Sequence, residues 1–205
     1  MALIEITVPT KWSAVTLKKY LDLQRDVKVY GEEQEGYIAC LMHHLCGFSA
    51  QYINQLDTET FQSIQKDLVG FMSKTDLPLQ RIIEVNGKQY GFEPNLSKMT
   101  YGAYLDITKY DTFTIDDNWA NIMAILYRPI KTKVGELYTI EAYKGSEDVT
   151  PFLELGMDIH FGALFFFVHL LEVLPSSILK SLTGSEILPP NIKLILERSG
   201  KLTHP

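Results

Sequence analysis

The segment Thr16-Leu-Lys-Lys-Tyr-Leu-Asp-Leu-Gln-Arg25 returns 84 residues later as Thr100-Tyr-Gly-Ala-Tyr-Leu-Asp-Ile-Thr-Lys109. The ungapped match continues into a second stretch, where Glu32-Glu33-Gln34 faces Asp116-Asp117-Asn118. Each copy opens on a threonine that predicts a helix N-cap, and apolar residues then recur at helical spacing. The acidic residues favour the positive end of another helix. The sequence therefore predicts a helix–loop–helix unit that is used twice.

The two copies share five of 28 aligned residues. Either an internal duplication or the shared composition of two helical segments accounts for this identity. In both cases the matching positions are packing and capping positions rather than reactive ones. The pattern therefore favours a protein that catalyses nothing.

Hydrophobic spacing and turn residues predict the remaining elements. Helices are expected at Thr16–Asp26, Glu32–His44, Ser49–Leu56 and Thr58–Ser73. Two alternating runs within Arg81–Phe92 flank Asn86-Gly87, which is the strongest short-range hairpin signal. A further strand is expected at Leu137–Tyr143. The expected fold class is α+β, mainly helical, with a small hairpin or sheet.

Phe152–Leu174 predicts a long hydrophobic C-terminal helix. Its uninterrupted apolar run, Phe161–Val168, is eight residues long, whereas a membrane span needs about 20. We therefore expect no membrane contact, and a helix that is apolar on nearly every side is buried in a core or covered by another subunit. A short helix over 176–182 and a final helix from Pro189 to about Arg198 are expected after it.

Composition limits the classes of function. The 205 residues, 46% of them hydrophobic, suffice for a real core, and we expect one compact domain made of segments 1–78, 79–148 and 149–205. The net charge is −6 and no block of five Lys or Arg occurs, so direct binding of nucleic acid is not expected. Two cysteines favour a reducing cytosol, and the N-terminus has no secretory pattern.

Cys40, His43, His44 and Cys46 are candidate metal ligands by residue type. They lie within two helical turns, whereas structural zinc sites join two separated ligand pairs. Small apolar thiols on a half-buried helix are the simpler interpretation. We expect neither a metal nor a cofactor.

Acid–base chemistry has two further candidates, Asp158 with His160 and His169 with Glu172. The two histidines are nine residues apart, which is about 13–14 Å along a helix, so they do not share a reacting centre. The acidic residues at 32, 33 and 35 fit a solvated helix N-terminus better than a cation site. No nucleophile-elbow, P-loop or dinucleotide motif occurs. No catalytic residue is predicted.

Whole segments of the chain resemble a known group of proteins. They are Thr16–Gln24, the Glu-rich stretch after it, Asn86–Phe92, Lys98–Asp106 and Asn121–Ile130. Over roughly residues 10–175 the chain resembles small proteins of tailed phages, in particular crAss-like phages of gut bacteria. The resemblance implies a structural or assembly component, such as a ring stacked below the portal of a short tail. The last 30 residues carry no such resemblance.

A ring subunit presents two different surfaces to its neighbours, and aromatic and Arg side chains are enriched at interface hot spots. The predicted interface residues are Trp119, Tyr127, Arg128, Phe165, Phe166 and Phe167. We expect a homo-oligomeric ring that contacts other virion proteins such as portal or tail components. It would lie in the head–tail region of the virion, and in the host cytoplasm during assembly.

Two alternatives stay open. A tail-assembly chaperone would bind other phage proteins transiently and would be absent from the finished particle. A small hydrolase or metal-dependent enzyme would use His160 or the Cys40–His44 groups, and would lose activity but not its fold on substitution of these residues.

Overall fold

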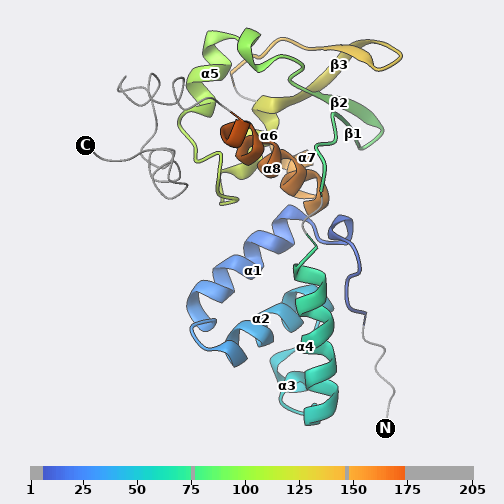
Figure 1. Ribbon diagram of the computed structural model, residues 1–205, viewed down its shortest axis with the longest axis vertical. Coiled ribbons are helices and arrows are strands. Elements are labelled where there is room, and N and C mark those ends of the chain that lie inside the picture. Colours follow the sequence, from blue (N-terminus) through green and yellow to red (C-terminus); the bar gives the residue numbers. More distant parts are fainter. Residues whose placement is uncertain (1–6, 75–76, 146–147, 174–205) are drawn as a thin grey trace, which may run out of the picture. The chain divides into compact units, whose positions relative to one another are not determined.

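The structure is a computed structural model that describes residues 7–74, 77–145 and 148–173 (Figure 1). The chain forms two compact units. Unit 1 takes in the described residues up to Leu77 together with Thr150–Gly162, and unit 2 takes in Pro78–Val149 together with the described residues from Ala163. Helices predominate and the strands form one antiparallel sheet, so the predicted mainly helical α+β class is confirmed.

Unit 1 is helical, and each of its longer helices begins close to the predicted residue. Its elements are η1 (Trp12–Ala14), α1 (Leu17–Tyr30), α2 (Gln34–Cys46), α3 (Ala50–Ile53), α4 (Thr58–Met72) and α7 (Thr150–Leu153). The Thr16 hydroxyl caps α1 by accepting a hydrogen bond from the Lys19 backbone at 3.3 Å. Ser49 and Asp57 cap α3 and α4 in the same way.

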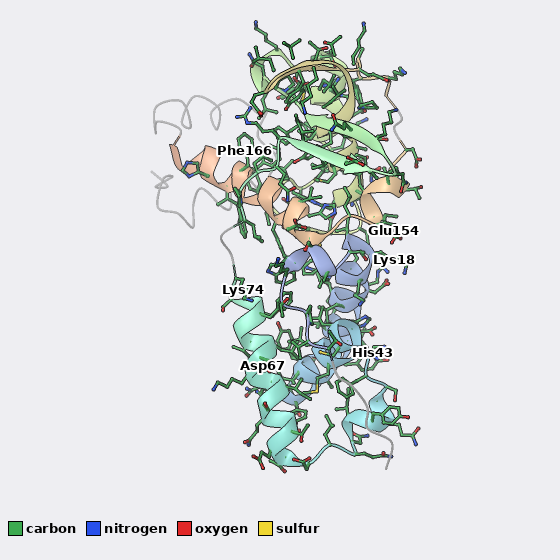
Figure 2. The ribbon with its side chains drawn as sticks, turned by 90° about the vertical axis from the view of Figure 1, so that its right-hand side faces the viewer. Lys18, His43, Asp67, Lys74, Glu154 and Phe166 are labelled. Atoms are coloured by element: carbon green, nitrogen blue, oxygen red, sulfur yellow. The ribbon has the colours of Figure 1, made fainter. Side chains whose placement is uncertain are left out.

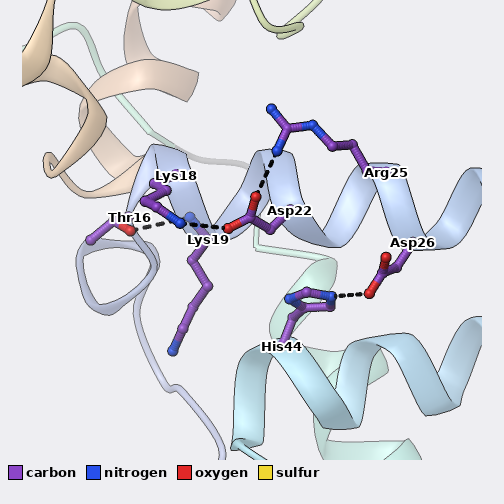
Figure 3. A network of polar contacts seen from close by, with 7 residues as sticks. All are labelled: Thr16, Lys18, Lys19, Asp22, Arg25, Asp26 and His44. Carbon is purple, nitrogen blue, oxygen red and sulfur yellow. Dashed lines mark hydrogen bonds and ion pairs between the residues drawn. The ribbon is translucent and has the colours of Figure 1, made fainter.

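Polar side chains connect the surfaces of α1 and α2 (Figure 3). Along α1, Asp22 forms ion pairs with Lys18 at 2.9 Å and with Arg25 at 2.7 Å. His44 on α2 reaches across to Asp26 on α1, with 2.7 Å between Nε2 and Oδ2. The exposed pairs add little stability because water screens them. The contact between His44 and Asp26 links the two helices directly.

An aromatic cluster forms the core of unit 1. The buried Trp12 ring lies 4.4 Å from the Phe71 ring and 4.8 Å from the Phe161 ring, measured between centroids. Its indole N–H donates to the Lys74 carbonyl at 2.9 Å, so the one polar atom of the ring is satisfied. Tyr20 completes the cluster, in edge-to-face contact with Phe161.

Backbone hydrogen bonds attach the segment between α7 and α8 to the N-terminal part of unit 1. Leu17 donates its N–H to the Leu155 carbonyl at 3.0 Å, and Met157 donates to the Val15 carbonyl at 2.8 Å. Gly156 lies between them and forms an antiparallel bridge with Thr16. Residues that are far apart in sequence therefore belong to one unit.

The hydrophobic helix α8 spans Met157–Val173, and its residues up to Gly162 belong to unit 1. The expected start at Phe152 is corrected, because the backbone of residues 154–156 leaves the helical path to pair with the N-terminal segment. The helices expected over 176–182 and from Pro189 lie outside the described residues. Among the described helices, none is long and apolar enough to cross a membrane.

The sheet of unit 2 comprises β1 (Ile82–Val85), β2 (Lys88–Phe92), β3 (Tyr127–Val134) and β4 (Leu137–Ile140), paired antiparallel in that order. The predicted hairpin is confirmed. Asn86 and Gly87 both have positive φ, 52° and 76°, as a type I′ turn requires.

Three helical elements of unit 2 are η2 (Leu96–Lys98), α5 (Tyr101–Ile107) and α6 (Trp119–Leu126). The Thr100 hydroxyl caps α5, accepting from the Ala103 backbone at 3.4 Å. Every residue of α6 except Asn121 is buried, so this short helix is the core of the unit. Strand β3 begins directly after it, a strand that the sequence did not predict.

Candidate functional site

The predicted interface residues in α6 and β3 lie inside unit 2. Trp119 has no exposed surface, and Tyr127 and Arg128 are buried in β3. The Tyr127 hydroxyl donates to the Gln80 carbonyl at 2.6 Å, and burial raises the pKa of this tyrosine. These three side chains therefore stabilise the fold of unit 2 and offer no surface to a partner.

Arg128 forms a buried ion pair with Glu93, and its Nη1 donates to the Glu141 carbonyl at 3.1 Å. A buried pair of this kind stabilises only while both partners are present. Tyr138 packs its ring against the backbone at Gly91 and brings its hydroxyl within 2.7 Å of the Phe92 carbonyl. These contacts stabilise the positions of β3 and β4 within the sheet.

The three predicted phenylalanines lie on α8 in unit 2. Phe166 (Figure 2) is half-buried. Its ring lies 5.3 Å from that of Phe92 on the sheet. Phe167 is buried, and Phe165 is half-buried. All three side chains are at least half-buried within unit 2. Their role in an interface stays a prediction.

The cysteine and histidine cluster of α2 lies in unit 1. Burial raises the pKa of the Cys40 thiol, whereas a nucleophilic cysteine needs a lowered one. His43 is exposed (Figure 2), with Nδ1 2.5 Å from the Phe48 carbonyl oxygen. Cys46 is half-buried, and burial raises its pKa as well. Within the described part of the chain, no group of three or more His, Cys, Asp or Glu is placed to hold a metal ion.

The same helix lines a largely apolar groove. The unit 1 groove, about 330 Å³ in volume, is lined by Tyr30 from α1, Ala39 and Cys40 from α2, and Ala50 and Ile53 from α3. Asp26 supplies a carboxylate at its edge. This volume lies near the lower end of the range for ligand sites, so it suits one or two side chains of a partner.

Three of the four acid–base candidates on α8 have described side chains, and these differ in burial. His160 is fully buried, and burial lowers its pKa to about 4 despite hydrogen bonds to the backbone of Phe152 and Leu155. The imidazole is therefore neutral at physiological pH. Asp158 lines a cavity of about 630 Å³ in unit 1, and His169 is exposed. Nothing is described of the Glu172 side chain.

A polar cavity of about 310 Å³ in unit 2 is lined by side chains that hydrogen-bond to one another. Asp106 accepts from Lys109 at 2.5 Å and from the Tyr143 hydroxyl at 2.6 Å. The hydrogen bond from Lys109, and secondarily that from Tyr143, lowers the pKa of Asp106. The carboxylate is thus committed to neighbours within the unit.

The most exposed apolar residues of the described chain are at the turn between β3 and β4. The hairpin tip, Val134–Leu137, carries Val134 and Leu137 directly opposite each other, and each side chain is 79% exposed. Gly135 has φ 59° and Glu136 a negative φ, the pattern of a type II′ turn that continues the strand twist. The hairpin tip therefore holds two apolar side chains in water on a short, paired hairpin. The turn between β3 and β4 lies at an edge of unit 2 (Figure 1).

A second exposed surface is on α5. The α5 face consists of Tyr101, Tyr104 and Leu105, which share one side of the helix by their spacing. In the sequence repeat, Tyr101 corresponds to Leu17, yet Leu17 is fully buried and Tyr101 is 74% exposed. The repeat thus preserves the N-caps, whereas its two copies bury different faces.

Sequence reasoning missed the hairpin tip although a signal was present. Lys131-Thr-Lys-Val134 and Leu137-Tyr-Thr-Ile140 alternate on either side of Gly135-Glu136, and a two-residue loop with Gly first predicts a type II′ hairpin. The strand at Leu137 was predicted, whereas no element was predicted for its partner, Lys131–Val134. No local sequence signal predicts that the α5 face is exposed, because the corresponding residue pattern is buried in α1.

Comparison of the chain with known protein families, with curated proteins and with solved structures gives no match.

Proposed function

We propose that the chain is a non-enzymatic structural protein of a tailed-phage virion, a ring or connector subunit of the head–tail region. It acts by self-association and by docking to neighbouring virion proteins such as portal or tail components. The resemblance over roughly residues 10–175 supports the phage setting, and the exposed surfaces support the mode of action.

The observation that carries the proposal is the hairpin tip. Val134 and Leu137 are held in water by a hairpin whose base is fixed by the Tyr138 contacts and by facing hydroxyls of Thr132 and Thr139, 2.5 Å apart. Exposed apolar side chains become favourable when a partner covers them. A rigid support also reduces the entropy lost on binding. These properties suit a permanent contact between subunits.

A closed ring needs two different surfaces on each subunit, because the contacts run head to tail. The hairpin tip of unit 2 and the unit 1 groove differ in shape, one projecting and one recessed. The α5 face adds a third surface with two exposed tyrosines, a residue type enriched at interfaces. One chain thus has enough surfaces for neighbours in a ring and for the next layer of the particle.

The test is quantitative mass spectrometry of virions purified from the phage that encodes the chain, with the major capsid protein as the copy-number standard. We expect the chain at about a dozen copies, the number of subunits in one ring on the portal axis. Many more copies would contradict a ring and indicate a capsid component or cargo. Absence from virions that assemble normally would contradict the structural role and favour the tail-assembly chaperone.

A further inference from the structure

We infer that the hairpin tip of one copy docks into the unit 1 groove of a second copy, in a head-to-tail contact. The inference rests on the proposed function and specifies which two surfaces form the ring contact. The occupant of the groove is thus another copy of this chain rather than a different virion protein.

Shape is the first argument. Val134 and Leu137 are adjacent cross-strand neighbours at the end of a two-residue turn, so they enter a recess together. The unit 1 groove offers about 330 Å³ between Tyr30, Ala50 and Ile53, room for a pair of aliphatic side chains. Docking would remove two largely exposed apolar residues and an apolar recess from water at the same time.

Charge is the second argument. Glu32, Glu33 and Glu35 are exposed at the start of α2 and follow closely on Tyr30, the last residue of α1, which lines the groove. Lys28 is the basic residue in the last turn of α1. None of the three glutamates has an ion-pair partner among the described residues.

The hairpin carries the opposite sign. Lys131 and Lys133 are exposed on β3 and also lack an ion-pair partner within the described part of the chain, while Glu136 is the one acid of the turn. A basic hairpin facing an acidic groove edge steers the two copies together and disfavours contact between two hairpins, where like charges would meet.

The experiment uses the full-length chain and measures self-association by sedimentation velocity and by light scattering after gel filtration. Leu137→Asp changes the hairpin tip, and Ala50→Glu changes the groove. Both positions are exposed, so the folds are kept, which circular dichroism verifies. Val69→Asp is the matched control, because Val69 is an exposed apolar residue of α4 that does not line the groove.

We expect each of the two variants to weaken self-association on the order of tenfold or more, as removal of an interface anchor does. Val69→Asp should associate like the parent chain. Association of the parent should also weaken with rising salt concentration, because exposed charge pairs are screened.

The decisive step is to mix the two variants. The Ala50→Glu chain keeps an intact hairpin tip and the Leu137→Asp chain keeps an intact groove, so the mixture should form a one-to-one dimer and nothing larger. Normal association of Ala50→Glu alone, or a mixture that stays monomeric, would overturn the inference while leaving the proposed self-association in place. A parent chain that is monomeric at every concentration would overturn both.

Discussion

Gly156 is the position where the structure makes its sharpest prediction about stability. A Cβ atom added there would lie 2.7 Å from the Ser13 Cα and 2.9 Å from the Ser13 carbonyl oxygen, whereas ordinary van der Waals contacts of a Cβ begin at 3.4 Å. The nearest atom, Asp158 Oδ1 at 2.5 Å, can rotate away, but the two Ser13 atoms belong to the backbone, so no side-chain rotation relieves their clash with the Cβ. Gly156→Ala must therefore separate the two segments by several tenths of an ångström.

The hydrogen bonds on either side of Gly156 resist that separation. They join Leu17 to Leu155 and Met157 to Val15 at 3.0 and 2.8 Å. Overpacking a tight contact costs about 1–3 kcal/mol, and a weakened backbone hydrogen bond adds about 1 kcal/mol. We expect Gly156→Ala to lower the free energy of unfolding of unit 1 by about 2–3 kcal/mol.

Gly70 provides the matched control, because the same substitution there should act in the opposite direction. It lies in α4, and a Cβ added to it would meet nothing within 4 Å. Alanine is a better helix former than glycine, so Gly70→Ala should stabilise unit 1 by about 0.5–1 kcal/mol.

The assay uses the two tryptophans of the chain, Trp12 in unit 1 and Trp119 in unit 2. In a Trp119→Phe background the remaining fluorescence reports on unit 1 alone. With a urea dependence of about 1–3 kcal/mol per molar, Gly156→Ala should lower the midpoint by about 1 M. The midpoint of Gly70→Ala should rise slightly. An unchanged or higher midpoint for Gly156→Ala would refute the close approach of the two segments.

Three further predictions concern buried groups. The pKa of His160 is about 4 in the folded chain, below the ordinary value of 6.5 that applies to the unfolded chain. As the pH falls, the unfolded chain therefore takes up the proton first. The free energy of unfolding of unit 1 should decrease by about 3 kcal/mol between pH 6.5 and pH 4. Urea midpoints across this range measure the loss, and His160→Gln should remove that part of the slope. Glu93→Gln leaves the Arg128 guanidinium buried without its counter-charge, so it should lower the free energy of unfolding of unit 2 by about 3 kcal/mol. An unchanged urea midpoint of the fluorescence of Trp119, the tryptophan of unit 2, would contradict the buried pair. Leu17→Ala should lower the free energy of unfolding of unit 1 by about 2–5 kcal/mol. Tyr101→Ala, at the corresponding position of the repeat, should change the stability of unit 2 by less than about 0.5 kcal/mol. Comparable losses of stability in thermal melts of the two variants would show that both faces are packed.

Features that depend on neighbouring residues were predicted from the sequence. The N-caps at Thr16 and Thr100 form as expected, since a cap needs only its own hydroxyl and a backbone N–H three residues on. The turn at Asn86-Gly87 also follows from local chemistry, because these residues tolerate positive φ. The α+β class follows from such signals taken together.

Burial was decided by the tertiary structure. Trp119, Tyr127 and Arg128 have the composition of an interface, but the sheet and the buried ion pair enclose them in unit 2. Leu17 in α1 is buried, whereas Tyr101 in α5, the corresponding residue of the sequence repeat, is exposed. The sequence by itself determined where helices and turns begin, because those energies arise within a few residues. Which apolar faces remain for a partner was decided only by the tertiary structure, because burial depends on segments that are distant in the chain.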